Sequence, residues 1–140
     1  MSSINFFTEE INFSLKDKNK LRHWIFEIVS QNNKIPRNIN YIFTSDTYLS
    51  KINEEYLEHK TLTDIVTFDQ SSEKDIIEGD IYISVDRVRD NAKKFNCSFN
   101  HELHRVMIHG VLHLLGFNDK TPAQKKEMRK NENHYLALRF

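Results

Sequence analysis

One stretch near the C-terminal end restricts the fold of this chain more than any other. It reads His109-Gly110-Val111-Leu112-His113-Leu114-Leu115-Gly116-Phe117-Asn118-Asp119 and holds two of the three glycines in the 140-residue sequence. Residues four apart on a helix share a face, so the imidazoles of His109 and His113 can bind one cation. Gly116 can adopt the left-handed backbone that ends a helix, after which Asp119 can return toward the histidines. The stretch therefore predicts a helix, a tight reversal and a three-ligand site.

The apolar residues of this helix predict how it is buried. They lie on one side of the helix at about 100° per residue, with the two histidines together on the flank. The predicted buried positions are Leu103, Met107, Val111 and Leu114. Gly110 on the same side has no side chain, so we expect another element to pack closely against the helix there.

A site of three ligands leaves a fourth position open, which is typical of catalytic metal sites, whereas structural zinc sites usually close with four. The alternative is a pair of partly buried histidines with a solvated aspartate. Zinc proteases carry glutamate directly after the first histidine, and Gly110 stands there instead, which argues against that class. The nearby His101-Glu102-Leu103-His104 has a different spacing, and we interpret it as the first turn of the helix.

Composition limits the class of protein. The sequence is 39% hydrophobic and 29% charged, with 20 basic and 20 acidic residues. This balance predicts one globular domain over residues 1–140, and a nucleic-acid partner would need a local basic patch. The single cysteine, Cys97, fits a reducing compartment, and no segment predicts a signal peptide or a membrane span. We therefore expect a cytoplasmic protein.

The order of predicted elements indicates an α+β fold. Strand patterns cover residues 2–7, 11–13, 39–44, 65–68 and 81–85, with Gly79 in a polar connection. Helical patterns surround residues 21–29, 49–56, 88–95, 103–114 and 122–138. Ser45, Asn100 and Thr121 are the expected caps of the second, fourth and fifth helices, and the second buries Leu49, Ile52 and Tyr56. We predict a single domain with a small mixed sheet of about four strands covered by about five helices.

Three motifs in the same order resemble the YbeY family of bacterial endoribonucleases and rRNA maturation factors. The stretch described first is similar to the family pattern H-G-x-L-H-L-x-G-[YF]-x-H through Phe117. Leu62–Phe68 resembles the T-D-V-L-S-F segment, preceded by the Asn53–Tyr56 helix end, and Gly79–Ile83 resembles the G-D-I strand. The resemblance covers roughly Asn53 to Thr121.

The resemblance implies a metal-dependent endoribonuclease that matures the 3′ end of 16S rRNA and acts in ribosome quality control. It implies one divalent ion, with zinc expected, held by His109, His113 and Asp119. The implied partners are rRNA and the small ribosomal subunit, without membrane or DNA. No general acid or base is assigned.

Two positions depart from the family pattern. Asp119 stands where histidine is usual, and a carboxylate can also bind zinc and other divalent ions. Leu57 stands where an arginine commonly handles substrate phosphate, and His59, Lys60 or Arg105 could replace it.

Other features leave alternatives open. Asp64 is interpreted either as a residue supporting the site or as a cap at the start of a strand. The basic residues of the last helix and its approach form either a phosphate-binding patch or a solvated face. They are Lys120, Lys125, Lys126, Arg129 and Lys130, and Lys93 and Lys94 precede the site helix. Alternative functions are a metallohydrolase of another substrate class and a ribosome-associated assembly factor with a mainly structural metal.

Overall fold

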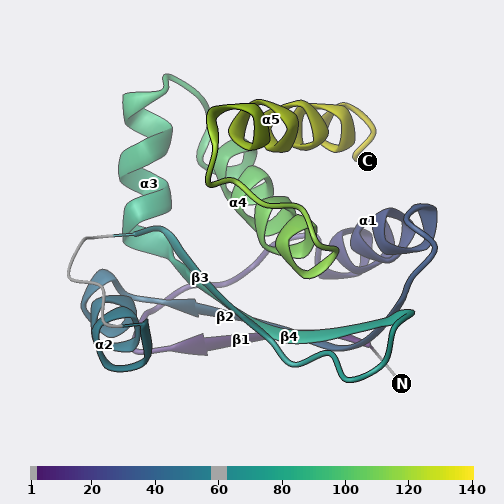
Figure 1. Ribbon diagram of the computed structural model, residues 1–140. Coiled ribbons are helices and arrows are strands. Elements are labelled where there is room, and N and C mark those ends of the chain that lie inside the picture. Colours follow the sequence, from purple (N-terminus) through teal and green to yellow (C-terminus); the bar gives the residue numbers. More distant parts are fainter. Residues whose placement is uncertain (1–2, 58–62) are drawn as a thin grey trace.

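A mixed β-sheet is the platform on which the helices are arranged (Figure 1). The computed structural model describes residues 3–57 and 63–140. Its strands are β1 (Ile4–Glu9), β2 (Ile35–Thr44), β3 (Ile65–Asp69) and β4 (Ile76–Ser84). Its helices are α1 (Lys18–Gln31), α2 (Asp46–Leu57), α3 (Val85–Lys94), α4 (Phe99–Leu114) and α5 (Pro122–Ala137).

The sheet has the strand order β1-β2-β4-β3. Strands β1, β2 and β4 are parallel neighbours, and β3 pairs with β4 in the antiparallel sense at one edge. Helices α1 and α4 share one core with the strand residues on one face of the sheet, and α5 packs on α4. Helix α2 contacts β3 and β4 from the opposite face, where Tyr48 stacks against Tyr82. The predicted α+β domain, with a four-stranded mixed sheet and five helices, is confirmed.

Helix α4 is held tightly against the sheet. The predicted apolar residues Leu103, Met107, Val111 and Leu114 are all buried. Inside this core, the Tyr41 hydroxyl of β2 donates a hydrogen bond of 2.9 Å to the Met107 carbonyl. A Cβ atom at Gly110 would lie only 2.8 Å from Ile81 Cγ2 on β4. The predicted close approach at Gly110 is therefore confirmed, and it fixes the height of α4 above the sheet.

Helix α5 begins at the predicted capping box. The Thr121 side chain accepts from the Gln124 backbone N–H, and the Gln124 side chain accepts in return from the Thr121 N–H. Farther along, the indole N–H of Trp24 on α1 donates to the Tyr135 carbonyl at 3.1 Å. These contacts fix α5 at both ends, and α5 is the helix that faces the site.

Several predicted boundaries were wrong. Residues 11–13 form no strand, although Ile11 and Phe13 pack against the core. Gly79 lies inside β4 rather than in a connection. A larger residue would not fit there, because a Cβ atom would come within 2.9 Å of Leu114 Cδ2 and still closer to the Phe68 carbonyl. Val85, expected in a strand, is the first residue of α3.

The helix caps and the buried face of α2 agree with the prediction only in part. Ser98, rather than Asn100, caps α4, because its hydroxyl accepts from the His101 N–H at 3.0 Å. The Ser45 cap of α2 is confirmed by the hydrogen bond from the Tyr48 N–H. Of the residues expected to be buried on α2, Leu49 is buried, whereas Tyr56 is 65% exposed.

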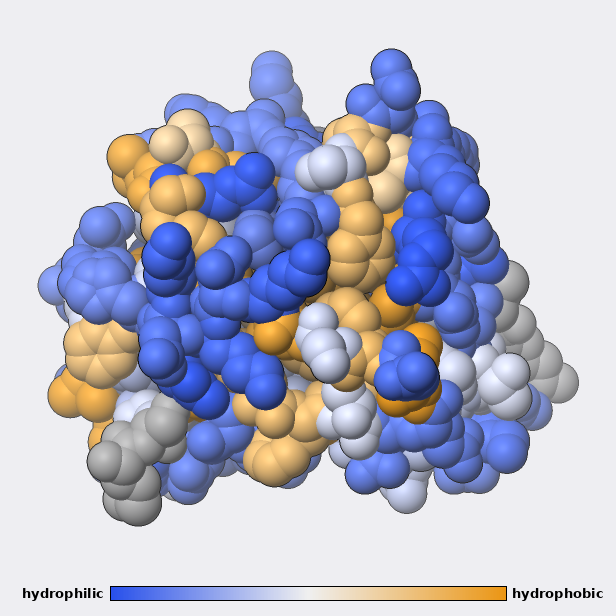
Figure 2. All heavy atoms as spheres, turned by 180° about the vertical axis from the view of Figure 1, so that it is seen from behind, coloured by the Kyte–Doolittle hydropathy of each residue, from blue (hydrophilic) through white to orange (hydrophobic). Residues whose placement is uncertain are grey.

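The surface is mainly polar. Figure 2 shows hydrophilic residues over most of one face, with hydrophobic ones gathered in a band between them. Among the described residues, none of the helices combines the length and apolar character needed to cross a membrane.

Candidate metal centre

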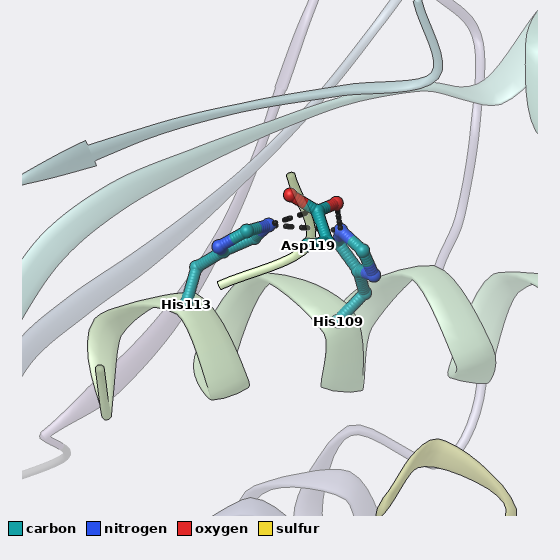
Figure 3. Close-up of side chains that lie close together, drawn as sticks. All are labelled: His109, His113 and Asp119. Atoms are coloured by element: carbon teal, nitrogen blue, oxygen red, sulfur yellow. Dashed lines mark hydrogen bonds and ion pairs between the residues drawn. The ribbon is translucent and has the colours of Figure 1, made fainter. Parts of the chain in front are cut away.

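Three side chains predicted to be ligands converge at the C-terminal half of α4 (Figure 3). The Nε2 atoms of His109 and His113 are 3.0 Å apart. Asp119 Oδ2 lies 3.2 Å from His109 Nε2 and 3.5 Å from His113 Nε2. One ligand atom from each residue fits within a 4.8 Å span. The structure thus brings together the three residues that the sequence spacing singled out.

The end of α4 explains how Asp119 reaches the histidines. Gly116 has a φ of 103°, the left-handed conformation predicted for it. Its N–H donates to the His113 carbonyl, and the Phe117 N–H donates to the Leu112 carbonyl, both at 3.0 Å. This pair of bonds is the Schellman arrangement, which satisfies the last carbonyls of a helix and reverses the chain. The reversal brings Asp119 back over the face that carries both histidines.

A buried glutamate orients the first histidine. Glu132 on α5 is 4% exposed, and its Oε2 lies 2.7 Å from His109 Nδ1. Its other oxygen accepts a hydrogen bond of 2.9 Å from the Arg105 guanidinium, which also donates to Asn133. Because the carboxylate accepts from Nδ1–H, the neutral His109 ring keeps the lone pair on Nε2, the atom that faces Asp119.

The charges around this cluster are coupled. Burial lowers the pKa of His109, but the hydrogen bond and charge of Glu132 outweigh burial, so this pKa is raised. Burial and the neighbouring His109 lower the pKa of His113. Burial opposes ionisation of Glu132, yet hydrogen bonds from His109 and Arg105 keep its pKa below the usual value. Glu132 is therefore ionised, and His113 favours the neutral form that a metal requires.

The donor set fits a divalent cation. With His109 Nδ1 bonded to Glu132, loss of the proton from Nε2 leaves a lone pair that faces the carboxylate of Asp119, which has only acceptors when ionised. Three electron-pair donors that point at one another are stabilised by a cation between them. Two imidazoles and one carboxylate match zinc ligation with an open position, and histidine in such sites commonly donates its other N–H to a carboxylate.

A cavity of about 390 Å³ opens beside the cluster. It lies between α3, α4 and α5, and its lining includes His109, Asp119, Glu132, Asp64 and Glu102. Asp64 precedes β3, where the Thr63 hydroxyl rather than Asp64 accepts from the Ile65 N–H. Burial raises the pKa of Asp64. Asp64 therefore faces the cavity beside the site, and it is not one of the three converging side chains.

The residues considered for contact with substrate phosphate lie in different parts of the chain, and only some are described by the structure. Leu57 is the last residue of α2, and His59 and Lys60 lie outside the described residues. Arg105 lines the cavity, but its guanidinium is already bonded to Glu132 and Asn133. Arg105 therefore stabilises Glu132 rather than presenting a free cation.

Two buried acids beside the site are not among the residues that the sequence predicts for it. Glu132 occupies the apolar stripe of α5, at i+4 from the buried Met128 and with Tyr135 and Leu136 following. Glu102 is 5% exposed and lines the cavity, whereas the sequence predicts for it only a place in the first helical turn. The sequence carries one signal for such residues, a carboxylate at an apolar position of a helix. It indicates a buried acid, and a buried acid needs a bonding partner.

A family model and two similar relatives carry the same family description. A family model described as Endoribonuclease YbeY matches residues 3–138. An Endoribonuclease YbeY from Amoebophilus asiaticus is 47% identical over 135 residues, covering 96% of this chain and 92% of the relative. One from Porphyromonas gingivalis is 41% identical over 138 residues, covering 99% and 91%.

A solved structure agrees with the fold. The solution structure of a protein from Thermotoga maritima superimposes with a TM-score of 0.65 at 29% identity. The match covers 95% of this chain and 86% of that protein. The three ordered motifs, the fold and these matches lead to one conclusion: the chain belongs to the Endoribonuclease YbeY family.

Proposed function

We propose that this protein is a metal-dependent endoribonuclease whose metal is held by His109, His113 and Asp119. The observation that carries the proposal is the convergence of the three donor atoms within 4.8 Å, next to an open cavity, in a member of an endoribonuclease family. Zinc is the ion that best matches two imidazoles, one carboxylate and an open position. A divalent ion there would acidify a water molecule and offset negative charge on a phosphoryl oxygen.

The protein's own residues prepare this chemistry. Glu132 holds the His109 ring so that Nε2 faces the ligand position, and Arg105 keeps Glu132 ionised. The Schellman turn sets the carboxylate of Asp119 over the histidines. These contacts fix the donors before any ion binds, which reduces the ordering cost of binding.

We further propose that the substrate is rRNA and that the step is maturation of the 3′ end of 16S rRNA. The protein would also have a role in ribosome quality control. It would act in the cytoplasm, at the small subunit. Membership of the family and the retained motifs support this proposal. The formal net charge of zero agrees with recognition by a local surface rather than by a general basic field.

The test is cleavage of RNA that contains the 3′ end of 16S rRNA, with and without chelator, by wild type and His113→Ala. We expect cleavage that chelator abolishes, zinc restores and the substitution removes. Cleavage that continues unchanged in His113→Ala would exclude the metal mechanism. Binding to small subunits without cleavage by metal-loaded wild type would favour an assembly factor instead.

A further inference from the structure

Glu102 is a buried acid of the cavity that is not bonded to any of the proposed ligands. The residue lines the cavity and is only 5% exposed. None of the residues that the structure describes donates a hydrogen bond to its carboxyl group, whose oxygens nevertheless are not sealed inside the protein. A buried acid without a bonding partner is costly to keep. Its opening into a cavity therefore suggests that a bound molecule supplies the partner.

Glu102 lies on the same side of α4 as His109. The two residues are seven apart, which is about 20° short of two full turns and about 10 Å along the helix axis. Figure 3 shows His109 and His113 together on one side of α4, and Val106, between Glu102 and His109 in the sequence, lines the same cavity. One wall of the cavity therefore carries a proposed ligand and, about 10 Å farther along α4, the Glu102 carboxyl.

This spacing suits the two ends of a phosphodiester cleavage. The attacking and leaving oxygens lie roughly in line on opposite sides of the phosphorus. In the proposed function the attack starts at the side of His109 and Asp119, so the leaving oxygen points away from them. That oxygen needs a proton as its bond to phosphorus breaks, and a positioned acid commonly supplies it. Glu132 cannot do so, because it is ionised and bonded to His109 and Arg105.

The surroundings of Glu102 favour its protonated form. Burial raises the pKa of this carboxyl most, and the charges of Asp64 before β3 and Glu132 on α5 raise it further. Arg105 on α4 and Arg129 on α5 act in the opposite direction without cancelling the rise. A carboxyl group kept neutral by burial is the usual form of a general acid near neutral pH.

Asp64 is the other acid that could carry this proton, but its contacts favour the carboxylate. Burial raises the pKa of Asp64 as well, while the charge of His109 and a hydrogen bond from the Asp64 backbone N–H act against burial. The side-chain nitrogen of Asn91 lies 3.5 Å from Asp64 Oδ2. Hydrogen bonds to the charged form favour it, and two neighbouring carboxyl groups rarely ionise together. Of this pair, Glu102 therefore holds the proton.

We propose that Glu102 is the general acid of the cleavage reaction and gives its proton to the ester oxygen that leaves phosphorus. The inference rests on the proposed function for the reaction and adds a residue that takes part in it. A water oxygen forms a bond to phosphorus and one proton of that water passes to solvent. The opposite P–O bond breaks, and the leaving oxygen keeps its electron pair and takes the proton of Glu102. The Glu102 carboxylate then regains a proton from solvent, so one phosphodiester is hydrolysed.

The test replaces the leaving oxygen by sulfur, because a thiolate is stable enough to leave without a proton. The probe is a short RNA with the 3′ end of 16S rRNA and a bridging phosphorothiolate at the bond that the wild type cleaves. Sulfur is placed on the 3′ or the 5′ side, according to which product end carries the hydroxyl group. Zinc-loaded wild type, Glu102→Gln and His113→Ala are compared on the oxygen and sulfur substrates. Glu127→Gln, which removes an exposed acid of α5, is the matched control.

The expected pattern is specific to an acid. Glu102→Gln lowers kcat on ordinary RNA by about 100-fold or more, the usual contribution of a general acid, and leaves KM and bound zinc unchanged. On the sulfur substrate the same variant cleaves at close to the wild-type rate. Glu127→Gln matches the wild type on both substrates. His113→Ala cleaves neither, because sulfur does not replace a metal ligand.

A second measurement needs no activity. NMR of metal-free protein labelled at the glutamate carboxyl carbons follows the ionisation of Glu102, whose signal is identified by its absence in Glu102→Gln. We expect this group to titrate at a higher pH than Glu127, and Asp64→Asn to lower that pH by removing a like charge.

Unchanged cleavage of ordinary RNA by Glu102→Gln would overturn the proposal, as would a loss that sulfur does not rescue in a folded, zinc-loaded variant. A Glu102 signal that titrates together with Glu127 would also overturn it. Circular dichroism and zinc content report the fold. Glu102→Asp, which keeps an acid on a shorter side chain, should lose less activity on ordinary RNA than Glu102→Gln.

Failure of this inference is distinguishable from failure of the proposed function. A wild type that cleaves no RNA, or a His113→Ala protein that cleaves normally, would contradict the proposed function. An inactive His113→Ala beside a Glu102→Gln protein that sulfur does not rescue would contradict only the role of Glu102.

Discussion

At the scale of single residues, the candidate metal centre depends on a chain of contacts that runs from α4 to α5 and back. Arg105 bonds to Glu132, Glu132 to His109, and His109 faces Asp119. Each contact fixes the next side chain. The proposed ligands are therefore supported by a buried ion pair whose partners come from two different helices.

Removing the carboxylate of Glu132 should weaken metal binding. Glu132→Gln keeps the size of the side chain but loses the charge that orients His109 Nδ1–H. We expect zinc affinity to fall by about 10–100-fold, the usual effect of losing such a supporting carboxylate. Competition with a chromophoric chelator measures it. Glu127→Gln, an exposed acid on the same helix, serves as the control, and equal affinities of the two variants would contradict the positioning role.

Asp119, the third residue of the proposed site, gives a second prediction at the level of single residues. Asp119→His restores the donor that the family commonly has and should keep metal binding, whereas Asp119→Ala should lose it. The carboxylate also lowers the net charge of the site by one relative to imidazole, so we expect the wild type to retain harder ions such as manganese better than Asp119→His. Titration with zinc and manganese checks this order. An unchanged preference would show that Asp119 is not a ligand.

At the scale of elements, the packing of α4 on the sheet sets the height of the histidines. Gly110→Ala adds a methyl group that would contact the buried Ile81, whose γ2 carbon is 2.8 Å from the added atom. Overpacking costs about 1–3 kcal/mol, and alanine's helix propensity returns about 1 kcal/mol. We expect a net loss of about 1 kcal/mol and a Tm lower by about 3 °C.

Thermal unfolding followed by circular dichroism measures this effect. Asn100→Ala, exposed in the first turn of α4, is the control and should leave the Tm within about 1 °C. A Gly110→Ala variant as stable as the wild type would mean that α4 is not seated as closely as the structure shows.

The elements also show how far sequence reasoning reaches. Helix positions with strong periodicity, such as the buried side of α4, and local devices such as the Thr121 box were predicted correctly, because their signals lie within a few residues. Gly79 was misplaced because its reason, a close approach of Phe68 and Leu114, exists only after folding. Glu132 was missed for the same reason, since its partners lie 23 and 27 residues away.

At the scale of the whole molecule, the C-terminal end closes the domain over α1 and α4. Arg139 donates to His104 Nδ1 at 2.7 Å, and the His104 ring meets the edge of Trp24 with a centroid separation of 5.9 Å. Phe140 contacts both rings. The imidazole must be neutral to accept from Arg139, so the stability of this closure depends on pH.

Burial and the charge of Arg139 lower the pKa of His104 to about 4, from the ordinary 6.5. Between these values the unfolded chain binds a proton and the folded one does not, so the free energy of unfolding falls as the pH drops from 6.5 toward 4. We expect His104 to contribute a loss of about 1 kcal/mol per pH unit in this window.

Urea unfolding at several pH values, in chelator, tests the contribution of His104. His104→Gln keeps an acceptor for Arg139 without the titrating ring and should show a shallower decline with acid than the wild type. Parallel curves for the two proteins would contradict the assigned role.

Elemental analysis of purified protein, with Asp119→Ala beside the wild type, shows whether His109, His113 and Asp119 bind a divalent ion. We expect close to one divalent ion per wild-type chain and near-complete loss in the variant, with the fold retained by circular dichroism. A wild type that neither carries nor rebinds a divalent ion, or an Asp119→Ala protein that keeps a full equivalent, would contradict it.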